Sequence, residues 1–195
     1  MKCWGFTLAA LTLCACARPR PDLADSPHSV RLVATPNSIA ALSAAQVTLG
    51  LPAEICFGGP LGRSALYLTF PAIGRERGAP QQAFISLSAR SGAASDGSSV
   101  TIEAWRISSA WKPSELQRWS DKPELAPPYA RAELSNSPAE DLRIDVTELL
   151  RFAARDPERD FGLALLASGS AGHGVSFATG MGGGRAPRLE LFYSR

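Results

Sequence analysis

The residues best suited to chemistry lie in a long proline-rich segment at 108–131, which carries Trp111, Trp119, Tyr129 and Arg131. Aromatic rings stack on the apolar faces of sugars, and the arginine fork matches the carboxylates or sulfates of acidic glycans. Connections of this length are usually functional or are packed by their own side chains. The two tryptophans therefore either line a sugar site or fill space between sheets and fix the loop, whereas Tyr129, which follows two prolines, is expected to be exposed.

A second group of chemically competent residues is acidic and lies between 140 and 148. Paired carboxylates carry out glycoside hydrolysis, which makes a polysaccharide-active enzyme one hypothesis. Acids at a strand-to-helix junction also serve as helix caps and as solvated surface residues, and we favour that interpretation. We therefore predict that the chain is not an enzyme. The group comprises Glu140, Asp141, Asp145 and Glu148.

Other catalytic patterns do not occur in the sequence. Its two histidines, His28 and His173, lie in a tether and in a glycine-flanked loop, and there is no Gly-x-Ser-x-Gly or His-Glu-x-x-His motif. We predict no cofactor and no catalytic metal. Structural calcium is the one metal site that the residue types allow, since it takes oxygen ligands from loops. The acids considered for it are Asp121, Asp141, Asp156 and Asp160.

The first residues have the pattern of an export signal. Lys2 precedes an apolar run at 6–13 that is too short to span a bilayer, and the run ends in Leu13-Cys14-Ala15-Cys16. This ending resembles the bacterial lipoprotein box, which predicts a signal peptide at 1–15 and lipid attachment at Cys16. A plain secretory signal cleaved near Ala17 is the alternative. In either case residues 16–28 form a tether.

Composition limits the remaining choices. The chain has 195 residues, of which 45% are hydrophobic, and this length suits one domain, assigned to 29–195. Its net charge of +2 comes without a run of basic residues, which argues against a nucleic-acid partner. The 17 glycines and 15 prolines separate short apolar runs, as is typical of an all-β protein.

Apolar and polar residues alternate at 64–70, 83–89, 100–107, 142–146 and 189–193, the period of half-buried strands. The alternation slips near Ala104 and Trp105, where we expect a β-bulge. A helical period follows at 148–155 and buries Leu149, Leu150, Phe152 and Ala153. Segments 29–34, 47–51 and 53–57 are expected to be extended, 38–46 a short helix or an irregular crossing, and 91–99 a loop. These elements predict an antiparallel β-sandwich of the jelly-roll type with one short helix.

Several of these segments together resemble a DNRLRE domain, a family of bacterial and archaeal surface modules that are also classed among carbohydrate-binding modules. The resemblance covers about residue 63 to the C-terminus, and Ile144-Asp145-Val146-Thr147 followed by a helix and a Gly-Leu strand is its most specific part. It implies a jelly-roll β-sandwich outside the cell, and some relatives bind acidic polysaccharide. The remaining matching segments are 64–70, 83–87, 100–107, 111–116, 119–123, 161–165 and 187–193.

The leading hypothesis is thus a lipid-anchored, non-enzymatic surface protein that binds polysaccharide of the cell envelope or the extracellular matrix. Ala17, rather than an aspartate, after the lipidated cysteine favours the outer membrane of a Gram-negative bacterium. The anchor would be the only contact with the membrane. The alternative is a structural or adhesion module that binds protein and has no sugar site.

Overall fold

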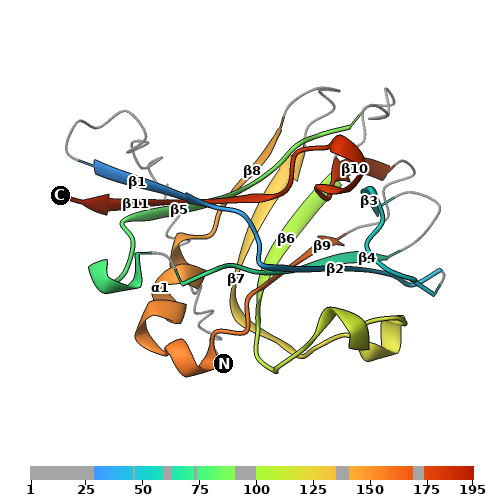
Figure 1. Ribbon diagram of the computed structural model, residues 1–195, viewed down its shortest axis with the longest axis horizontal. Coiled ribbons are helices and arrows are strands. Elements are labelled where there is room, and N and C mark those ends of the chain that lie inside the picture. The colour runs from blue at the N-terminus through green and yellow to red at the C-terminus, as the bar shows by residue number, and fades with distance from the viewer. Residues whose placement is uncertain are drawn as a thin grey trace, which may run out of the picture.

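The computed structural model describes residues 29–45, 47–58, 63–72, 74–90, 100–134, 141–168 and 174–195. Antiparallel strands dominate and a single α-helix occurs in this part of the chain, which confirms the predicted all-β class and the helix near 148–155 (Figure 1). The strands are β1 (Ser29–Ala34), β2 (Ser38–Ser43), β3 (Glu54–Gly58), β4 (Ser64–Thr69), β5 (Gln82–Leu87), β6 (Val100–Ile107), β7 (Leu125–Leu134), β8 (Leu142–Asp145), β9 (Leu163–Ser168), β10 (Gly174–Ala178) and β11 (Arg188–Ser194). The helix is α1 (Thr147–Arg155), and short 3-10 turns include η3 (Pro113–Glu115) and η4 (Trp119–Asp121).

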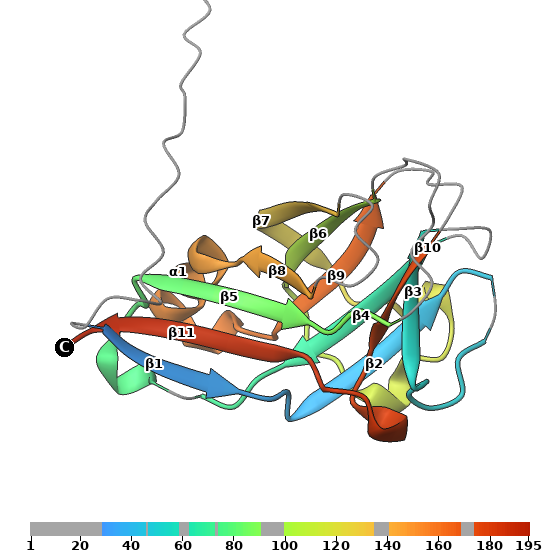
Figure 2. The ribbon, with the colours of Figure 1, turned by 90° about the horizontal axis from the view of Figure 1, so that it is seen from above.

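Two sheets form the body of the molecule. The first has the strand order β1-β11-β5-β8, and the second has the order β2-β4-β9-β6-β7. Ile85 lies opposite Leu189 and Ile144 on neighbouring strands of the first sheet, while Leu165 lies opposite Leu66 and Ala104 in the second. These side chains all belong to one buried apolar cluster, so the two sheets pack face to face (Figure 2).

The chain passes repeatedly between the two sheets. Strands β1, β11, β5 and β8 form one layer, and β4, β9, β6 and β7 lie together in the other, so the chain changes sheet at most connections after β4. This order favours the jelly-roll arrangement, which stays a prediction.

The two ends of the sandwich are covered differently. Helix α1 lies at one end, and the two-stranded sheet of β3 and β10 lies at the other, as both ribbon views show (Figures 1 and 2). Leu149 of α1 is buried in the same apolar cluster as Phe57 and Phe177, whose rings lie 5.9 Å apart at a tilt of 54°. Burial of each such side chain contributes about 1.5–3 kcal/mol, so both covers are held to the sheets mainly by apolar contact.

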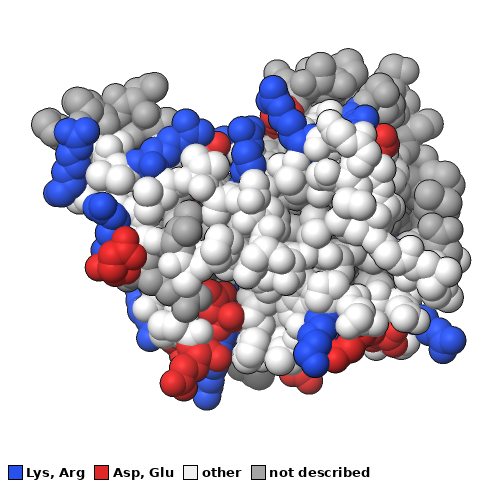
Figure 3. All heavy atoms as spheres, in the orientation of Figure 1, with Lys and Arg blue, Asp and Glu red and all other residues white. Residues whose placement is uncertain are grey.

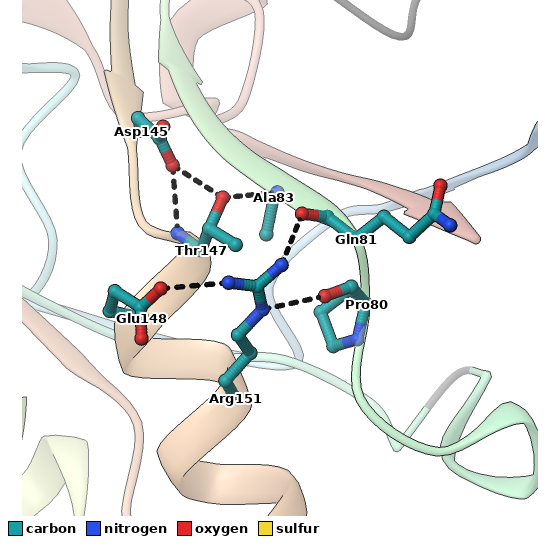
Figure 4. A network of polar contacts seen from close by, with 7 residues as sticks. All are labelled: Pro80, Gln81, Ala83, Asp145, Thr147, Glu148 and Arg151. Carbon is teal, nitrogen blue, oxygen red and sulfur yellow. Dashed lines mark hydrogen bonds and ion pairs between the residues drawn. The ribbon is translucent and has the colours of Figure 1, made fainter. Parts of the chain in front are cut away.

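The junction between β8 and α1 is fixed by a polar network (Figure 4). The Thr147 backbone N–H donates to the Asp145 carboxylate at 2.9 Å, and the Thr147 hydroxyl donates to the same oxygen. That hydroxyl also accepts a bond of 2.9 Å from the backbone N–H of Ala83 in β5, and all of Thr147 is buried. The N-cap residue itself is Val146, which makes no side-chain cap bond, so an N-cap at Asp145 or Thr147 is not what the structure has. Asp145 instead satisfies the first helical N–H, and Thr147 joins the helix to the neighbouring strand.

Arg151 extends the same network across the start of β5. Its Nε donates to the Pro80 carbonyl at 3.1 Å, and its Nη2 donates to the Gln81 carbonyl at 2.8 Å. Nη1 binds the Glu148 carboxylate at 2.8 Å, one helical turn away (Figure 4). These bonds to backbone carbonyls just before β5 hold α1 against the sheet.

Some sequence-based predictions were wrong. Segment 38–46 does not begin as a helix, because β2 pairs with β4 and buries alanines on both of its faces. The helix propensity of alanine is a weak preference that strand pairing overrides here. Segment 47–51 forms no strand, whereas the extended prediction for 53–57 is confirmed by β3. The predicted loop at 91–99 and the segments 1–15 and 16–28 lie outside the described residues.

The irregularity predicted near Ala104 and Trp105 occurs one residue later and on the partner strand. Trp105 pairs with Tyr129 and Arg106 pairs with Ala126, so β7 carries two extra residues, both proline. Pairing of β6 with β9 stays regular through the same region. The side chains of β6 therefore keep alternating between the two faces of the sheet. Arg106 lies on the same, interior face as Ile102 and Ala104.

Candidate functional site

One row of side chains crosses the outer face of the second sheet. The register places Tyr67 of β4 next to Ala164 of β9, then Trp105 of β6 and Tyr129 of β7. Ala40 of β2 begins the row beside Tyr67. Small alanines thus alternate with the rings, and the row has a covered end at Tyr67 and an open end at Tyr129.

The covered end lies beneath the segment that connects β6 to β7. Trp111 places its ring 6.0 Å from that of Tyr67 and donates from Nε1 to the Phe161 carbonyl at 2.8 Å. Trp119 packs on the same buried cluster and holds Lys122 over its ring at 5.4 Å. Both tryptophans are half-buried, so they fix the segment between β6 and β7 to the sheet. This agrees with the second of the two interpretations of the sequence, in which the tryptophans fix the loop.

Tyr67 is completely buried, and its hydroxyl has no hydrogen-bond partner among the described residues. Replacing Tyr67 with phenylalanine should raise the free energy of unfolding by about 1 kcal/mol, because an unsatisfied buried hydroxyl costs about 1–3 kcal/mol. Urea unfolding at neutral pH measures the change. Tyr129→Phe, at an exposed ring, is the control and should change little; a less stable Tyr67→Phe protein would contradict the expectation.

The same substitution should change how stability depends on pH. Burial raises the pKa of Tyr67 above its usual value of about 10. The native state then keeps this proton at pH values where the unfolded state has lost it, so stability falls as pH rises above about 10. In the Tyr67→Phe protein that part of the loss disappears, and the difference between the two proteins should grow between about pH 9 and pH 11.

The open end is a pair of stacked rings, named here the ring platform (Trp105 and Tyr129). The ring centres are 4.3 Å apart and the planes differ by 15°. Trp105 covers one face of the Tyr129 ring, yet 47% of Tyr129 remains exposed. An exposed aromatic ring held rigidly by a second ring is suited to packing against the apolar face of a sugar.

Polar groups flank the ring platform on the same two strands. Arg131 Nη2 donates to Glu103 Oε1 at 2.8 Å, and Trp105 Nε1 donates to Glu103 Oε2 at 3.0 Å. Arg131 also lies 5.9 Å from the centre of the Tyr129 ring. The hydrogen bond and the charge of Glu103 raise the pKa of Arg131 above its usual value, so the guanidinium stays charged.

The structure therefore brings together two of the four residues proposed for the ligand site. Tyr129 and Arg131 share the outer side of β7, whereas Trp111 and Trp119 belong to the covered cluster; Cys16 lies outside the described residues. The segment expected to be a loop throughout 108–131 ends at β7, which begins at Leu125. Glu103 and Trp105 were missed, although a tryptophan on the polar side of the β6 alternation is a usable signal.

The acidic residues at the junction of β8 and α1 make structural contacts. Asp145 accepts hydrogen bonds from Thr147, the first residue of α1, and Glu148 binds Arg151, while Glu140 falls outside the described residues. Elsewhere, the carboxylate of Asp121 accepts hydrogen bonds from the Arg118 backbone N–H, which has the larger effect, and from the Ser120 hydroxyl, and both lower the pKa of Asp121. Within the described ranges no three His, Cys, Asp or Glu side chains meet in a way that would hold a metal ion.

On the face seen in Figure 3, Lys and Arg side chains lie along the rim, and the centre is uncharged. Among the described residues, no helix is both long and apolar enough to cross a bilayer.

No protein-family model matches the chain, and no curated protein matches its sequence. The resemblance to DNRLRE domains therefore rests on the sequence motifs alone and stays a prediction.

Proposed function

We propose that this chain is an exported, non-enzymatic module that binds polysaccharide of the cell envelope or the extracellular matrix at the ring platform. The observation that supports the proposal is the stacked pair of Trp105 and Tyr129, with nearly half of Tyr129 open to solvent. A sugar ring packs its C–H face on such a surface without losing the hydration of its hydroxyl groups.

The flanking charges narrow the class of sugar. Glu103 neutralises Arg131 and is itself mostly buried, with 14% of its side chain exposed against 53% for Arg131. An arginine already paired with a carboxylate offers its remaining N–H groups to hydroxyls, and it has little net charge to attract a uronic acid or a sulfate. We therefore favour a neutral polysaccharide over the acidic one that the resemblance implies.

Replacing Tyr129 with alanine should weaken polysaccharide binding at least tenfold, since it removes the exposed ring and leaves the strand pairing unchanged. Affinity electrophoresis through gels that contain neutral or acidic polysaccharides measures the dissociation constant from the retardation. Leu49→Ala is a matched control, because Leu49 is an apolar side chain that is 86% exposed and lies outside the ring platform.

The outcomes separate the elements of the proposal. Retardation of the unaltered protein by neutral polysaccharide, lost in Tyr129→Ala and kept in Leu49→Ala, supports it. Equal retardation of both variants would place the ligand elsewhere, and no retardation across the panel would contradict glycan binding. Retardation only by acidic polysaccharide would overturn the preference for neutral sugar.

Attachment to the membrane through Cys16 is the second part of the proposal. It is supported by the lipoprotein-like ending of the signal at Leu13-Cys14-Ala15-Cys16. With Cys16 replaced by alanine, the protein should leave the membrane fraction of expressing cells and no longer incorporate labelled fatty acid. A Cys14→Ala variant should remain in the membrane fraction; release of that variant instead would move the attachment to Cys14.

A protein-binding module is the alternative function, and one observation favours it. Val47 and Leu49 are exposed apolar residues, and Leu49 borders a hollow of about 330 Å³ between β2 and η3. Exposed apolar side chains that flank a hollow are common at protein interfaces. Loss of binding to cell-envelope fractions in Leu49→Ala, but not in Tyr129→Ala, would support this function over glycan binding.

A further inference from the structure

Arg106 is a charged residue among the apolar side chains that β6 turns inward. Ile102 and Ala104 precede it on the same side of the strand and belong to the main core. Only 9% of Arg106 is exposed, and its guanidinium carbon lies 4.2 Å above the centre of the Phe152 ring in α1. The side chain therefore extends into the end of the sandwich beneath α1.

The charge of Arg106 is weakly compensated. Its Nε and Nη2 donate to the Pro127 carbonyl at 3.4 and 3.3 Å, longer than the ~2.7–2.9 Å that is usual for bonds from a charged nitrogen to a carboxylate. Nη1 makes no hydrogen bond to the described residues. Glu190, the other buried charged residue of the described part, has Arg31 at 2.9 Å and Arg143 at 3.8 Å. No ion pair joins Arg106 to a carboxylate of the described residues, and a buried charge without a directly paired opposite charge is costly, so Arg106 has capacity for an anionic partner.

A cavity lies beside this guanidinium. Its volume is about 100 Å³, and Arg106 forms part of its wall together with residues of α1, the end of β4 and the inner side of β11. The other walls are mainly apolar and include Phe70, Leu149, Leu150 and Leu163. Pockets for drug-sized ligands measure about 300–1,000 Å³, so this cavity suits a much smaller molecule.

We propose that the cavity binds a small apolar monocarboxylate, such as a short-chain fatty acid. The carboxylate accepts a hydrogen bond from Nη1 of Arg106, and the hydrocarbon chain lies against Leu149 and Leu150. Asp160 also borders the cavity and accepts a bond from the Gly162 N–H at 3.3 Å. A second negative charge on the ligand would meet this carboxylate, so dicarboxylates and phosphates should bind more weakly than monocarboxylates.

Three probes of equal chain length test the proposal on the unaltered protein. Hexanoate should bind in calorimetry with one site and should raise the unfolding temperature in a saturable way. Hexan-1-ol should bind at least tenfold more weakly, and hexylamine should not bind, because Arg106 repels it. Equal binding of hexanoate and hexan-1-ol would show an apolar cavity without an anion site, and the absence of hexanoate binding would overturn the proposal.

Two variants locate the site. Arg106→Met keeps the apolar stem and removes the charge, so hexanoate binding should be lost while weak binding of hexan-1-ol remains; Arg185→Met, at an exposed arginine, should bind hexanoate normally. Ala154→Phe fills the cavity from α1 and should abolish binding of both probes. It decides the matter if Arg106→Met does not fold, since unchanged hexanoate binding in the folded Ala154→Phe protein would place the site elsewhere.

Discussion

Replacing Gly162 with alanine is expected to lower the free energy of unfolding by about 2–5 kcal/mol. Gly162 precedes β9 and has a φ of +100°, a region that side-chain-bearing residues rarely adopt. A Cβ atom built there would lie 2.2 Å from the backbone oxygen of Leu68 and 3.0 Å from Cγ2 of Thr69. Because the first of these atoms belongs to a central strand, relief of the clash must move β4 or β9.

The control for this substitution is Gly50→Ala. Gly50 has a similarly positive φ of +78°, but a Cβ atom there meets nothing within 4 Å. Its alanine variant should therefore show only the conformational cost of about 1–2 kcal/mol. Urea unfolding of the three proteins gives the two differences. Equal losses in the two variants would mean that the approach to Leu68 costs nothing.

Replacing Thr147 with valine is expected to lower the free energy of unfolding by about 2–4 kcal/mol. Valine keeps the shape of threonine but lacks the hydroxyl that accepts from the Ala83 N–H and donates to Asp145. The Ala83 N–H would stay buried without an acceptor, which alone costs about 1–3 kcal/mol, and the carboxylate would lose one of its donors. The contact between α1 and β5 should weaken as a result.

Thr147→Ser separates the hydroxyl from the methyl group. Serine keeps both hydrogen bonds and loses one buried methyl, so its cost should be about 1 kcal/mol. Chemical denaturation measures stability, and hydrogen exchange of the Ala83 amide reports the bond directly. If valine proved as harmless as serine, or if the amide stayed protected in the valine variant, the polar network would not be what fixes the helix.

The sequence predicted best the elements whose periodicity follows from having one face buried. Segments 100–107 and 142–146 correspond to β6 and β8, whose buried residues alternate with less buried ones, and the helical period at 148–155 corresponds to α1. In each case the pattern records contact with a single core, which local spacing is sufficient to show. The position of the cap was less accurately predicted, because the N-cap residue is Val146 rather than Asp145 or Thr147.

Where two faces are covered, or where the partner is distant, the sequence was a weaker guide. Ala40 and Ala41 of β2 are buried on opposite sides of their strand, so no alternation was present to read. The start of β7 was hidden by Pro127 and Pro128, residues that disfavour an interior strand and are tolerated here at an edge. The local sequence pattern of a strand does not show which other strand pairs with it.

The candidate site illustrates the same limit. Tyr129 and Arg131 were identified from residue type, but their partners Trp105 and Glu103 lie more than twenty positions away and meet them only through the register of β6 and β7. Arg106 had no signal at all, because a charged residue that follows an alternating strand is ordinarily taken for its exposed end. Register and strand order had to be known before either cluster could be recognised.

The two prolines of β7 have a further consequence, for self-association. β7 is an edge strand of its sheet, and the free edge of a strand is a template on which another molecule can add a strand. Pro127 and Pro128 have no N–H, so a strand from another molecule would lack two hydrogen-bond donors to pair with beside the ring platform. Nucleation of intermolecular β-structure should therefore be suppressed at the edge that presents Tyr129, so the face that we propose as the polysaccharide site should stay accessible at high protein concentration.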